Sequence, residues 1–185
     1  MTPMEANIAQ DPIANRTDPA TALEDEQPLR TKWAWAVGTF VGIGFWRPGS
    51  GTWASLVTLG LWWLLAHFVI PASWQWLAAT VIVWMVMIVG IPASSIVELE
   101  SGRKDPGHVV VDEVVGQLIA LIAVPLRWKY LILSFILFRV FDIVKPPPIR
   151  RLEKLEGGAG IVLDDVGAGL YALVIVQLLV HYRVL

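Results

Sequence analysis

Long apolar runs alternate with short charged stretches along the chain. The longest run, from Pro48 to Val97, contains no Asp, Glu, Lys or Arg. Because a helix needs about 20 apolar residues to cross a bilayer, this run predicts two membrane-spanning helices. Three further apolar segments follow it. The pattern as a whole predicts about five spans, at residues 52–70, 75–91, 109–126, 129–145 and 164–183.

Proline and glycine mark the expected ends of these spans. Proline cannot continue a helix from its interior, so we expect Pro71 to separate the first two spans. Gly90 and Pro92 should end the second span. Pro125 and the proline triplet that begins at Pro146 should end the third and the fourth.

The first 46 residues follow a different pattern. Segment 33–46 is apolar but short and contains glycine, which favours an interfacial or re-entrant helix, with a full crossing left open. Residues 1–30 have no apolar periodicity and are rich in Pro, Asp, Glu, Thr and Ala. We expect them to form a disordered acidic tail, followed by a single helical membrane domain at 31–185.

The composition agrees with a membrane protein. Of the 185 residues, 56% are hydrophobic and 10 are tryptophan, more apolar than an ordinary soluble domain. A soluble all-α domain with 109–126 and 129–145 as core helices is the alternative, but a chain of this length cannot bury the run from Pro48 to Val97. The predicted fold is an all-α, multi-helix polytopic membrane bundle with acid-rich cytoplasmic loops. The absence of cysteine excludes thiol nucleophiles and thiolate metal sites.

Basic residues concentrate at the end of the predicted bundle where spans 52–70, 109–126 and 164–183 begin, which we call the charged end. By the positive-inside rule this end faces the cytoplasm. The opposite end has only Arg127, Lys129 and Arg183. The basic residues at the charged end are Arg30, Lys32, Arg47, Arg103, Lys104, Lys145, Arg150, Arg151 and Lys154.

Acidic residues gather at the same end. Asp112 and Glu113 begin the third span, Asp142 lies near the end of the fourth, and Asp164 and Asp165 begin the fifth. An ionisable side chain inside a membrane segment costs about 2.5–3.5 kcal/mol on insertion scales, and it usually pairs or serves a site. The clustering of these acids therefore indicates a functional site.

Two spacings predict that the acids meet. Gly116 follows Asp112 by four residues, and Gly169 follows Asp165 by four, so each acid lies one turn from a position where a neighbouring helix can approach closely. In the fourth span, Arg139, Asp142 and Lys145 lie at positions i, i+3 and i+6, so we expect their side chains on one face of the helix. For the pair formed by Arg139 and Asp142 alone, a salt bridge that only neutralises the span is an equally good interpretation.

Carboxylates gathered without Cys favour a hard cation, and Mg²⁺ binds a few carboxylates together with water and phosphate oxygens. Which acid is ligand and which is base stays open. His108, before the third span, is an additional candidate as general acid or ligand. The candidate metal ligands are Asp112, Glu113, Asp142, Asp164 and Asp165, and the candidate catalytic residues are Asp112, Glu113, Asp142, Asp165 and His108.

Cations near these acids are candidates for binding a phosphate. Arg139, Lys145 and Arg150 could pair with it, and arginine offers a bidentate fork. The stretch RPGSGTWAS at 47–55 precedes the first span, where Gly51 and Thr52 would present backbone amides to an anion at a helix N-terminus. Turn formation alone would also explain these glycines, as it would the EGGAG stretch at 156–160.

At these residues the sequence resembles the phosphatidylglycerophosphatase A family of bacterial inner-membrane enzymes. The resemblance implies Mg²⁺-dependent removal of the terminal phosphate from phosphatidylglycerophosphate to give phosphatidylglycerol in phospholipid biosynthesis. It implies a multi-pass protein of the bacterial inner (cytoplasmic) membrane with a phospholipid substrate and no nucleic-acid partner. The matching stretches are SGTWAS at 50–55, KDPGHVVVDEVVGQ at 104–117, FRVFDIVKPPPIRRLE at 138–153 and GGAGIVLDDVGAGLYA at 157–172.

Other interpretations of the same acids remain at this point. A small ion or proton transporter could use membrane acids as a relay, and a non-catalytic membrane subunit could use them to bind a partner. For a phosphatase, attack by metal-activated water is the simplest mechanism, while an aspartyl-phosphate on Asp142 or Asp165 is a second one. The oligomeric state is not predicted.

Overall fold

The computed structural model describes residues 30–152 and 155–183, and this part of the chain is helical without any strand. The predicted all-α class is therefore confirmed. The predicted acidic tail at 1–30 lies outside the described residues except for Arg30. The α-helices are α2 (Lys32–Gly38), α3 (Ser50–Phe68), α4 (Gln75–Ser101), α5 (Val111–Ala120), α6 (Trp128–Val144), α7 (Ile149–Leu152) and α8 (Gly158–His181), with short 3-10 turns η1 (Ile43–Phe45) and η2 (Ala72–Trp74).

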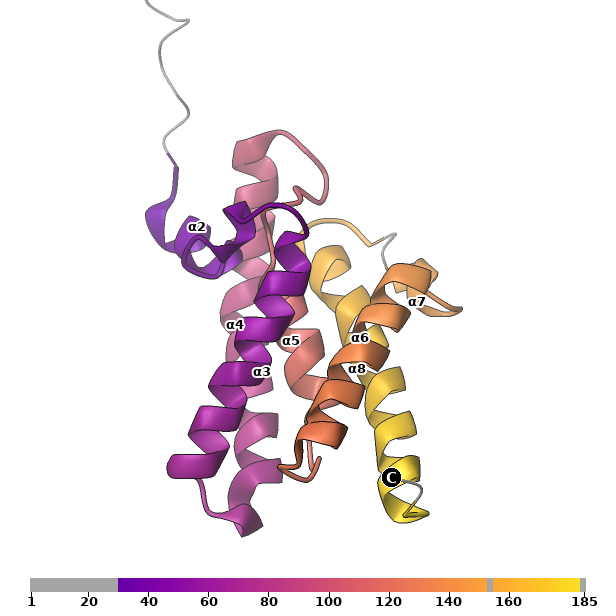
Figure 1. Ribbon diagram of the computed structural model, residues 1–185. Helices are drawn as coiled ribbons and strands as arrows, with labels where there is room; N and C mark the ends of the chain where they lie inside the picture. Colours follow the sequence, from indigo (N-terminus) through magenta and orange to yellow (C-terminus); the bar gives the residue numbers. More distant parts are fainter. Residues whose placement is uncertain (1–29, 153–154, 184–185) are drawn as a thin grey trace, which may run out of the picture.

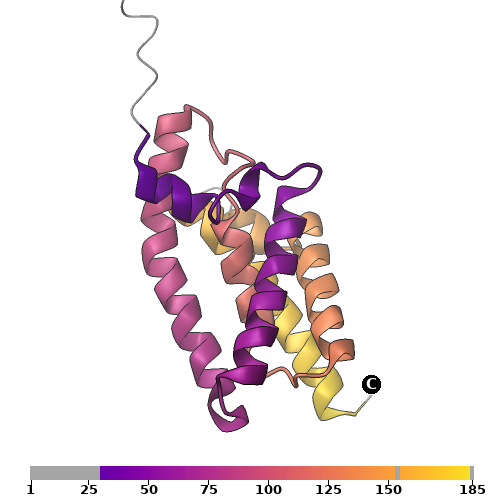
Figure 2. The same cartoon turned by 60° about the vertical axis from the view of Figure 1, so that its left-hand side comes forward.

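The long helices run alternately up and down. Figures 1 and 2 show that α3, α5 and α8 begin at the same end of the bundle, where α4 and α6 finish. The loop before α3, the α4–α5 loop and the segment with α7 therefore meet at the charged end, as the sequence predicts. Helix α2 lies across this end, and α8 finishes at the opposite one.

Helix α5 occupies the centre of the bundle, which corrects the prediction of a span at 109–126. It has only 10 residues, about 15 Å at 1.5 Å per residue, against roughly 30 Å of hydrocarbon. Every residue from Val114 to Ala120 is buried by the surrounding helices. An apolar run that is covered by protein looks the same in sequence as one that is covered by lipid, so the pattern could not separate the two.

Helix α4 continues past the point where the sequence predicts its end. Gly90 and Pro92 lie inside the helix, which finishes only at Ser101. Proline removes one backbone hydrogen bond, but α4 packs along α2, α5 and α8, and this packing keeps the helix continuous. Gly90 lies against α5, since a Cβ added there would be 3.0 Å from the Val111 side chain.

Helix α8 begins earlier than predicted. It starts at Gly158, so Asp164 and Asp165 lie in its second turn instead of opening it. Gly157 forms the turn before α8, with a φ of 68°, as turn formation in this stretch predicts. Gly158 and Gly160 are helical, and Gly158 allows α8 to touch α4: a Cβ there would overlap the Ile91 carbonyl oxygen and lie 2.8 Å from the Ser95 nitrogen. The Gly158 amide donates to Ser95 Oγ at 2.8 Å.

Helices α5 and α8 approach each other closely through the two glycines that the sequence indicates. A Cβ at Gly169 would lie 2.5 Å from the Gly116 carbonyl oxygen and 3.0 Å from Ile119 Cβ. A Cβ at Gly116 would overlap the Phe138 ring and lie 2.8 Å from the Asp165 carbonyl oxygen. Because Gly116 and Gly169 have no side chain, α8 can bring Asp165 close to α5, the helix that carries Asp112.

Segment 33–46 forms two short helical pieces, α2 and η1, instead of a span. Its first turn is fixed to the end of α4 by Glu100, which accepts hydrogen bonds from the Thr31 amide at 3.0 Å and from Trp35 Nε1 at 2.6 Å. With 7 residues, α2 is too short to cross a bilayer. The segment therefore covers the charged end.

Two helical segments in the described part of the chain have the length and composition of a membrane crossing. They are Ala72–Ser101, with a mean hydropathy of 2.2, and Gly158–His181, with 1.8. The predicted number of about five spans is not confirmed. Helices α3 and α6, with 19 and 17 residues, match the predicted spans 52–70 and 129–145 in position.

Candidate functional site

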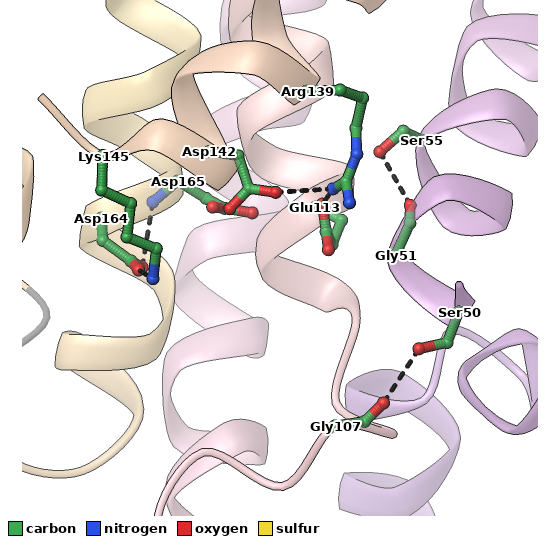
Figure 3. A network of polar contacts seen from close by, with 10 residues as sticks. All are labelled: Ser50, Gly51, Ser55, Gly107, Glu113, Arg139, Asp142, Lys145, Asp164 and Asp165. Carbon is green, nitrogen blue, oxygen red and sulfur yellow. Dashed lines mark hydrogen bonds and ion pairs between the residues drawn. The ribbon is translucent and has the colours of Figure 1, made fainter. Parts of the chain in front are cut away.

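Arg139 of α6 joins acids from two helices. Its Nη1 atom pairs with Asp142 Oδ2 at 2.8 Å and with Glu113 Oε2 of α5. All three side chains are mostly buried. The pair within α6 predicted from the sequence is therefore real, but it is shared with a second helix. Figure 3 shows the carboxylates of Glu113 and Asp142 next to the guanidinium group.

Lys145 and Asp164 form a second ion pair beside the first. The Lys145 Nζ atom lies 2.7 Å from Asp164 Oδ2, and the Asp165 amide donates to Asp164 Oδ1 at 3.0 Å. Lys145 ends α6 in the left-handed conformation, at a φ of 45°, just before the proline triplet. Because α6 ends here, the Lys145 side chain points toward α8 and does not share the helix face of Arg139 and Asp142.

Asp112 and Asp165 each have one carboxylate oxygen that lacks a hydrogen-bond partner among the described residues. Asp112 Oδ1 and Asp165 Oδ2 are buried and accept no hydrogen bond from the described residues. Asp165 lies within electrostatic range of Glu113, Asp112, Asp142 and Asp164, and Figure 3 shows its carboxylate pointing toward Asp142 and Glu113. A buried carboxylate oxygen without a donor is costly unless a ligand completes it.

The two orphaned oxygens bear on the metal prediction. Among the described residues, no three His, Asp or Glu side chains lie close enough to enclose an ion by themselves. Mg²⁺ does not require such a cage, because it usually binds one or two carboxylates and keeps water and substrate phosphate oxygens as its other ligands. Asp112 and Asp165 fit that donor set, while Glu113, Asp142 and Asp164 are engaged by cations.

A cavity of about 620 Å³ opens beside this cluster. Its wall includes Lys145 and Asp164 of the second ion pair, together with Arg150, whose Nη2 atom donates to the Val144 carbonyl at 3.3 Å. Apolar side chains that face outward, such as Ile143 and Leu155, line the same opening. We call it the Lys145/Arg150 cavity. Its lining suits a charged headgroup attached to an apolar tail.

The first turn of α3 closes the cluster from the other side. Gly51 lies so close to Glu113 that an added Cβ would overlap the carboxylate and lie 3.2 Å from Arg139 Nη1. Thr52 follows in the same turn. The role of these two residues in binding phosphate stays a prediction, but Gly51 has a clear local role: only glycine leaves room for the Glu113–Arg139 pair.

Gly51→Ala is expected to lower turnover by about 10-fold or more while leaving the helix content unchanged. The added methyl group would displace the Glu113 carboxylate, and overpacking of this kind costs roughly 1–3 kcal/mol. Phosphate release and far-ultraviolet circular dichroism measure the two effects. Gly60→Ala, in the same helix but with nothing within 4 Å of the added Cβ, is the matched control. Equal activity of the two variants would contradict the assignment.

His108 stands apart from the acid cluster. Its ring stacks on Trp35 and Phe45, with centroid distances of 5.0 and 5.5 Å. Burial lowers the pKa of the imidazole below its ordinary value, and the charges of Arg30 and Arg103 lower it further. The His108 Nε2 atom is buried without a partner among the described residues. A neutral histidine held in this way is poorly suited to be the general acid considered from the sequence.

Sequence reasoning treated several basic residues only as a charge bias. Lys104 lines the Lys145/Arg150 cavity, and Arg47 and Arg103 line another cavity at the charged end together with His108. These residues come from two loops that are distant in sequence. The only signal that could have pointed to them is their position: Arg47 and Lys104 begin the stretches already singled out at 47–55 and 104–117, and Arg103 directly precedes the second.

Comparisons with known proteins find relatives that are named as lipid phosphatases. A Bacteroides thetaiotaomicron protein provisionally named phosphatidylinositol-3-phosphatase is 40% identical over 144 residues, which cover 76% of this chain and 89% of the relative. Phosphatidylglycerophosphatase A of Haemophilus influenzae is 38% identical, covering 73% and 81%, and that of Escherichia coli K12 is 30% identical, covering 80% and 82%.

No solved structure matches the chain. The sequence model described as phosphatidylglycerophosphatase A matches residues 36–180, a range that contains the whole acid cluster and both cavities. The resemblance noted from the sequence motifs is thereby confirmed. The chain belongs to the phosphatidylglycerophosphatase A family and is a phosphoric monoester hydrolase.

Proposed function

We propose that the protein hydrolyses phosphatidylglycerophosphate to phosphatidylglycerol and inorganic phosphate, with Mg²⁺ as cofactor, as a step of phospholipid biosynthesis. The observation that carries this proposal is the pair of buried, orphaned carboxylate oxygens on Asp112 and Asp165, which lie beside acids that Arg139 and Lys145 neutralise. The names of two of the relatives supply the substrate.

The chemistry follows from the positions of the side chains. Asp112 and Asp165 would hold the Mg²⁺ ion, with Glu113 and Asp142 beside them. When bound, the ion supplies charge that polarises the phosphoryl oxygens and lowers the pKa of a coordinated water. Arg139 is placed to balance charge that develops on the phosphoryl oxygens, while Lys145 and Arg150 orient the headgroup in their cavity.

The reaction consumes one water molecule. Its oxygen forms a bond to phosphorus, the bond between phosphorus and the glycerol oxygen breaks, and the leaving oxygen takes up a proton. Direct attack by water is the simplest route, and an aspartyl-phosphate on Asp142 or Asp165 is the other. Hydrolysis in ¹⁸O-labelled water combined with a search for phosphorylated protein distinguishes them.

The surface of the bundle supports a location within a membrane. Helix α4 presents Trp84, Met85 and Ile88 outward, each more than half exposed. Tryptophan is typical of the two interfaces of a bilayer. Exposed tryptophans occur at the charged end (Trp33, Trp46 and Trp53) and again at the opposite end (Trp74, Trp76 and Trp128).

Helix α3 connects these two groups of tryptophans. Its 19 residues measure roughly 28 Å at 1.5 Å per residue, close to the thickness of the hydrocarbon layer. We therefore infer a multi-pass protein of the bacterial inner membrane whose site faces the cytoplasm. The ion transporter and the non-catalytic subunit considered from the sequence lose support, because the relatives are named as phosphatases.

Detergent-purified protein tests the function directly. It should release phosphate from phosphatidylglycerophosphate in the presence of Mg²⁺. Chelation of Mg²⁺ should lower the rate by at least about 100-fold, and added Mg²⁺ should restore it. Phosphatidic acid and phosphatidylinositol-3-phosphate serve as parallel substrates, the second because of the name of the Bacteroides relative. Activity that resists the chelator would refute the metal, and preference for the inositol lipid would refute the substrate.

A further inference from the structure

The cavity that holds His108 is not used by the proposed reaction. It has a volume of about 580 Å³ and lies between the loop before α3 and the α4–α5 loop. Its walls include Arg47 from the first loop, Ser50 at the start of α3 and Arg103 from the second loop. Ser50 Oγ donates to the Gly107 carbonyl at 2.9 Å and joins the two walls (Figure 3). We call it the Arg47/Arg103 cavity.

The charge of this cavity is uncompensated. Two arginines line it, and no acidic residue does among the described residues. Within the same part of the chain, neither arginine forms an ion pair. The Lys145/Arg150 cavity differs, because Asp105 and Asp164 also line it. Of the two, the Arg47/Arg103 cavity is therefore the stronger attractor for an anion.

Backbone and imidazole groups add hydrogen-bond capacity to the positive charge. Helix α3 begins at Ser50 after Gly49, which offers no side chain to cap the first amides, whereas the Gly158 amide of α8 is satisfied by Ser95. The buried His108 Nε2 atom also lacks a partner among the described residues. Two guanidinium groups, uncapped amides and an imidazole together match the oxygens of a phosphate group.

The cavity shares a wall with the acid cluster. Ser50 lines the cavity, and the next residue, Gly51, lies against Glu113 and Arg139. The substrate of the proposed function carries two phosphate groups, a terminal monoester and a diester, joined by a three-carbon glycerol. One substrate molecule can therefore place its terminal phosphate at the acid cluster and its second phosphate in the neighbouring cavity.

We propose that the Arg47/Arg103 cavity is a second phosphate subsite, next to the site of hydrolysis. The proposal rests on the proposed function for its choice of substrate. The phosphate bound there is either the diester group of phosphatidylglycerophosphate, which makes the cavity a determinant of specificity, or the inorganic phosphate after its release. Both have the same chemistry, and the experiment below separates them.

The test uses the full-length protein in detergent with Arg47→Gln, Arg103→Gln and the double variant. Both arginines are exposed, so the substitutions should leave the fold intact, which circular dichroism checks. Arg151→Gln is the matched control, because Arg151 is exposed at the same end but lines neither cavity. Substrates are phosphatidylglycerophosphate and phosphatidic acid with identical acyl chains, since phosphatidic acid lacks the second phosphate.

Two results would support the subsite, and each identifies a source. If it binds the diester, each substitution lowers kcat/KM for phosphatidylglycerophosphate by roughly 10- to 100-fold and changes that for phosphatidic acid by less than about 3-fold. If it binds released phosphate, inhibition of phosphatidic acid hydrolysis by inorganic phosphate weakens by about 10-fold or more. Arg151→Gln changes neither quantity.

A calorimetric titration of the protein with inorganic phosphate completes the test, because it measures phosphate binding without relying on catalysis. The wild-type protein should bind phosphate more tightly than the double variant by about 10-fold or more. An equal loss on both lipids with unchanged phosphate binding, or no change in any of these measurements, would overturn the subsite. If the wild-type protein released no phosphate from either lipid, the proposed function would fail, and the titration alone would decide the subsite.

Discussion

Asp165→Asn and Asp112→Asn are each expected to lower phosphate release by at least about a thousandfold, which corresponds to roughly 4 kcal/mol of transition-state stabilisation. Each carboxylate has a buried oxygen without a partner among the described residues. An amide of the same size keeps the packing but removes the negative charge that a divalent cation needs. The protein should still insert into membranes, because neither substitution changes the apolar surface.

Cation binding provides a second measurement for this prediction. Mn²⁺ replaces Mg²⁺ at sites of this kind and can be followed by electron paramagnetic resonance, so both variants should show weakened Mn²⁺ binding. Glu156→Gln is the control, since Glu156 is exposed near the same end. Normal turnover in either Asp variant, or unchanged Mn²⁺ binding in both, would show that these acids do not hold the ion.

Glu113→Gln and Asp142→Asn should act by a different route. Both acids already neutralise Arg139, so losing one leaves a buried cation with one fewer partner, which is costly. We expect turnover to fall strongly here too, but with part of the effect arising from displacement of Arg139. The structure thus separates four acids that looked equivalent in sequence into two that are unsatisfied and two that are paired.

The acid cluster could be predicted from the sequence because two local signals coincided. The order of the apolar segments placed the ends that carry Asp112, Asp142 and Asp165 together, and the glycines one turn away indicated close helix contacts. Both signals depend on short-range spacing, which a sequence shows directly. The contact between Gly116 and Gly169 confirms the second of them.

Element lengths were predicted less well, for a physical reason. The segment at 109–126 is apolar because protein surrounds the helix within it, and Gly158 of the EGGAG stretch is a glycine because α8 touches α4 there. In both places tertiary packing, which a single sequence does not show, determines the residue types. The convergence of Arg47 and Arg103 was missed for the same reason, since each lies in a loop whose path depends on the rest of the fold.

Gly169→Ala should be a strongly damaging single-methyl change in the bundle, and it tests whether the contact between α5 and α8 positions the site. The added Cβ would lie 2.5 Å from the Gly116 carbonyl oxygen, which is backbone and cannot rotate away. Helices α5 and α8 must then separate, at a cost of roughly 1–3 kcal/mol in the free energy of unfolding. Asp165, one turn before Gly169, would move away from Asp112.

The expected result is therefore a lower midpoint of thermal unfolding in detergent together with weaker Mn²⁺ binding by the folded protein at low temperature. Gly60→Ala adds the same methyl group to α3 where nothing lies within 4 Å, and it should raise stability by up to about 1 kcal/mol because alanine favours a helix. A destabilised Gly169→Ala protein that still bound Mn²⁺ normally would show that the glycine contact holds the bundle together but does not position the acids. Loss of both properties would show that α5 and α8 must touch for Asp112 and Asp165 to share an ion.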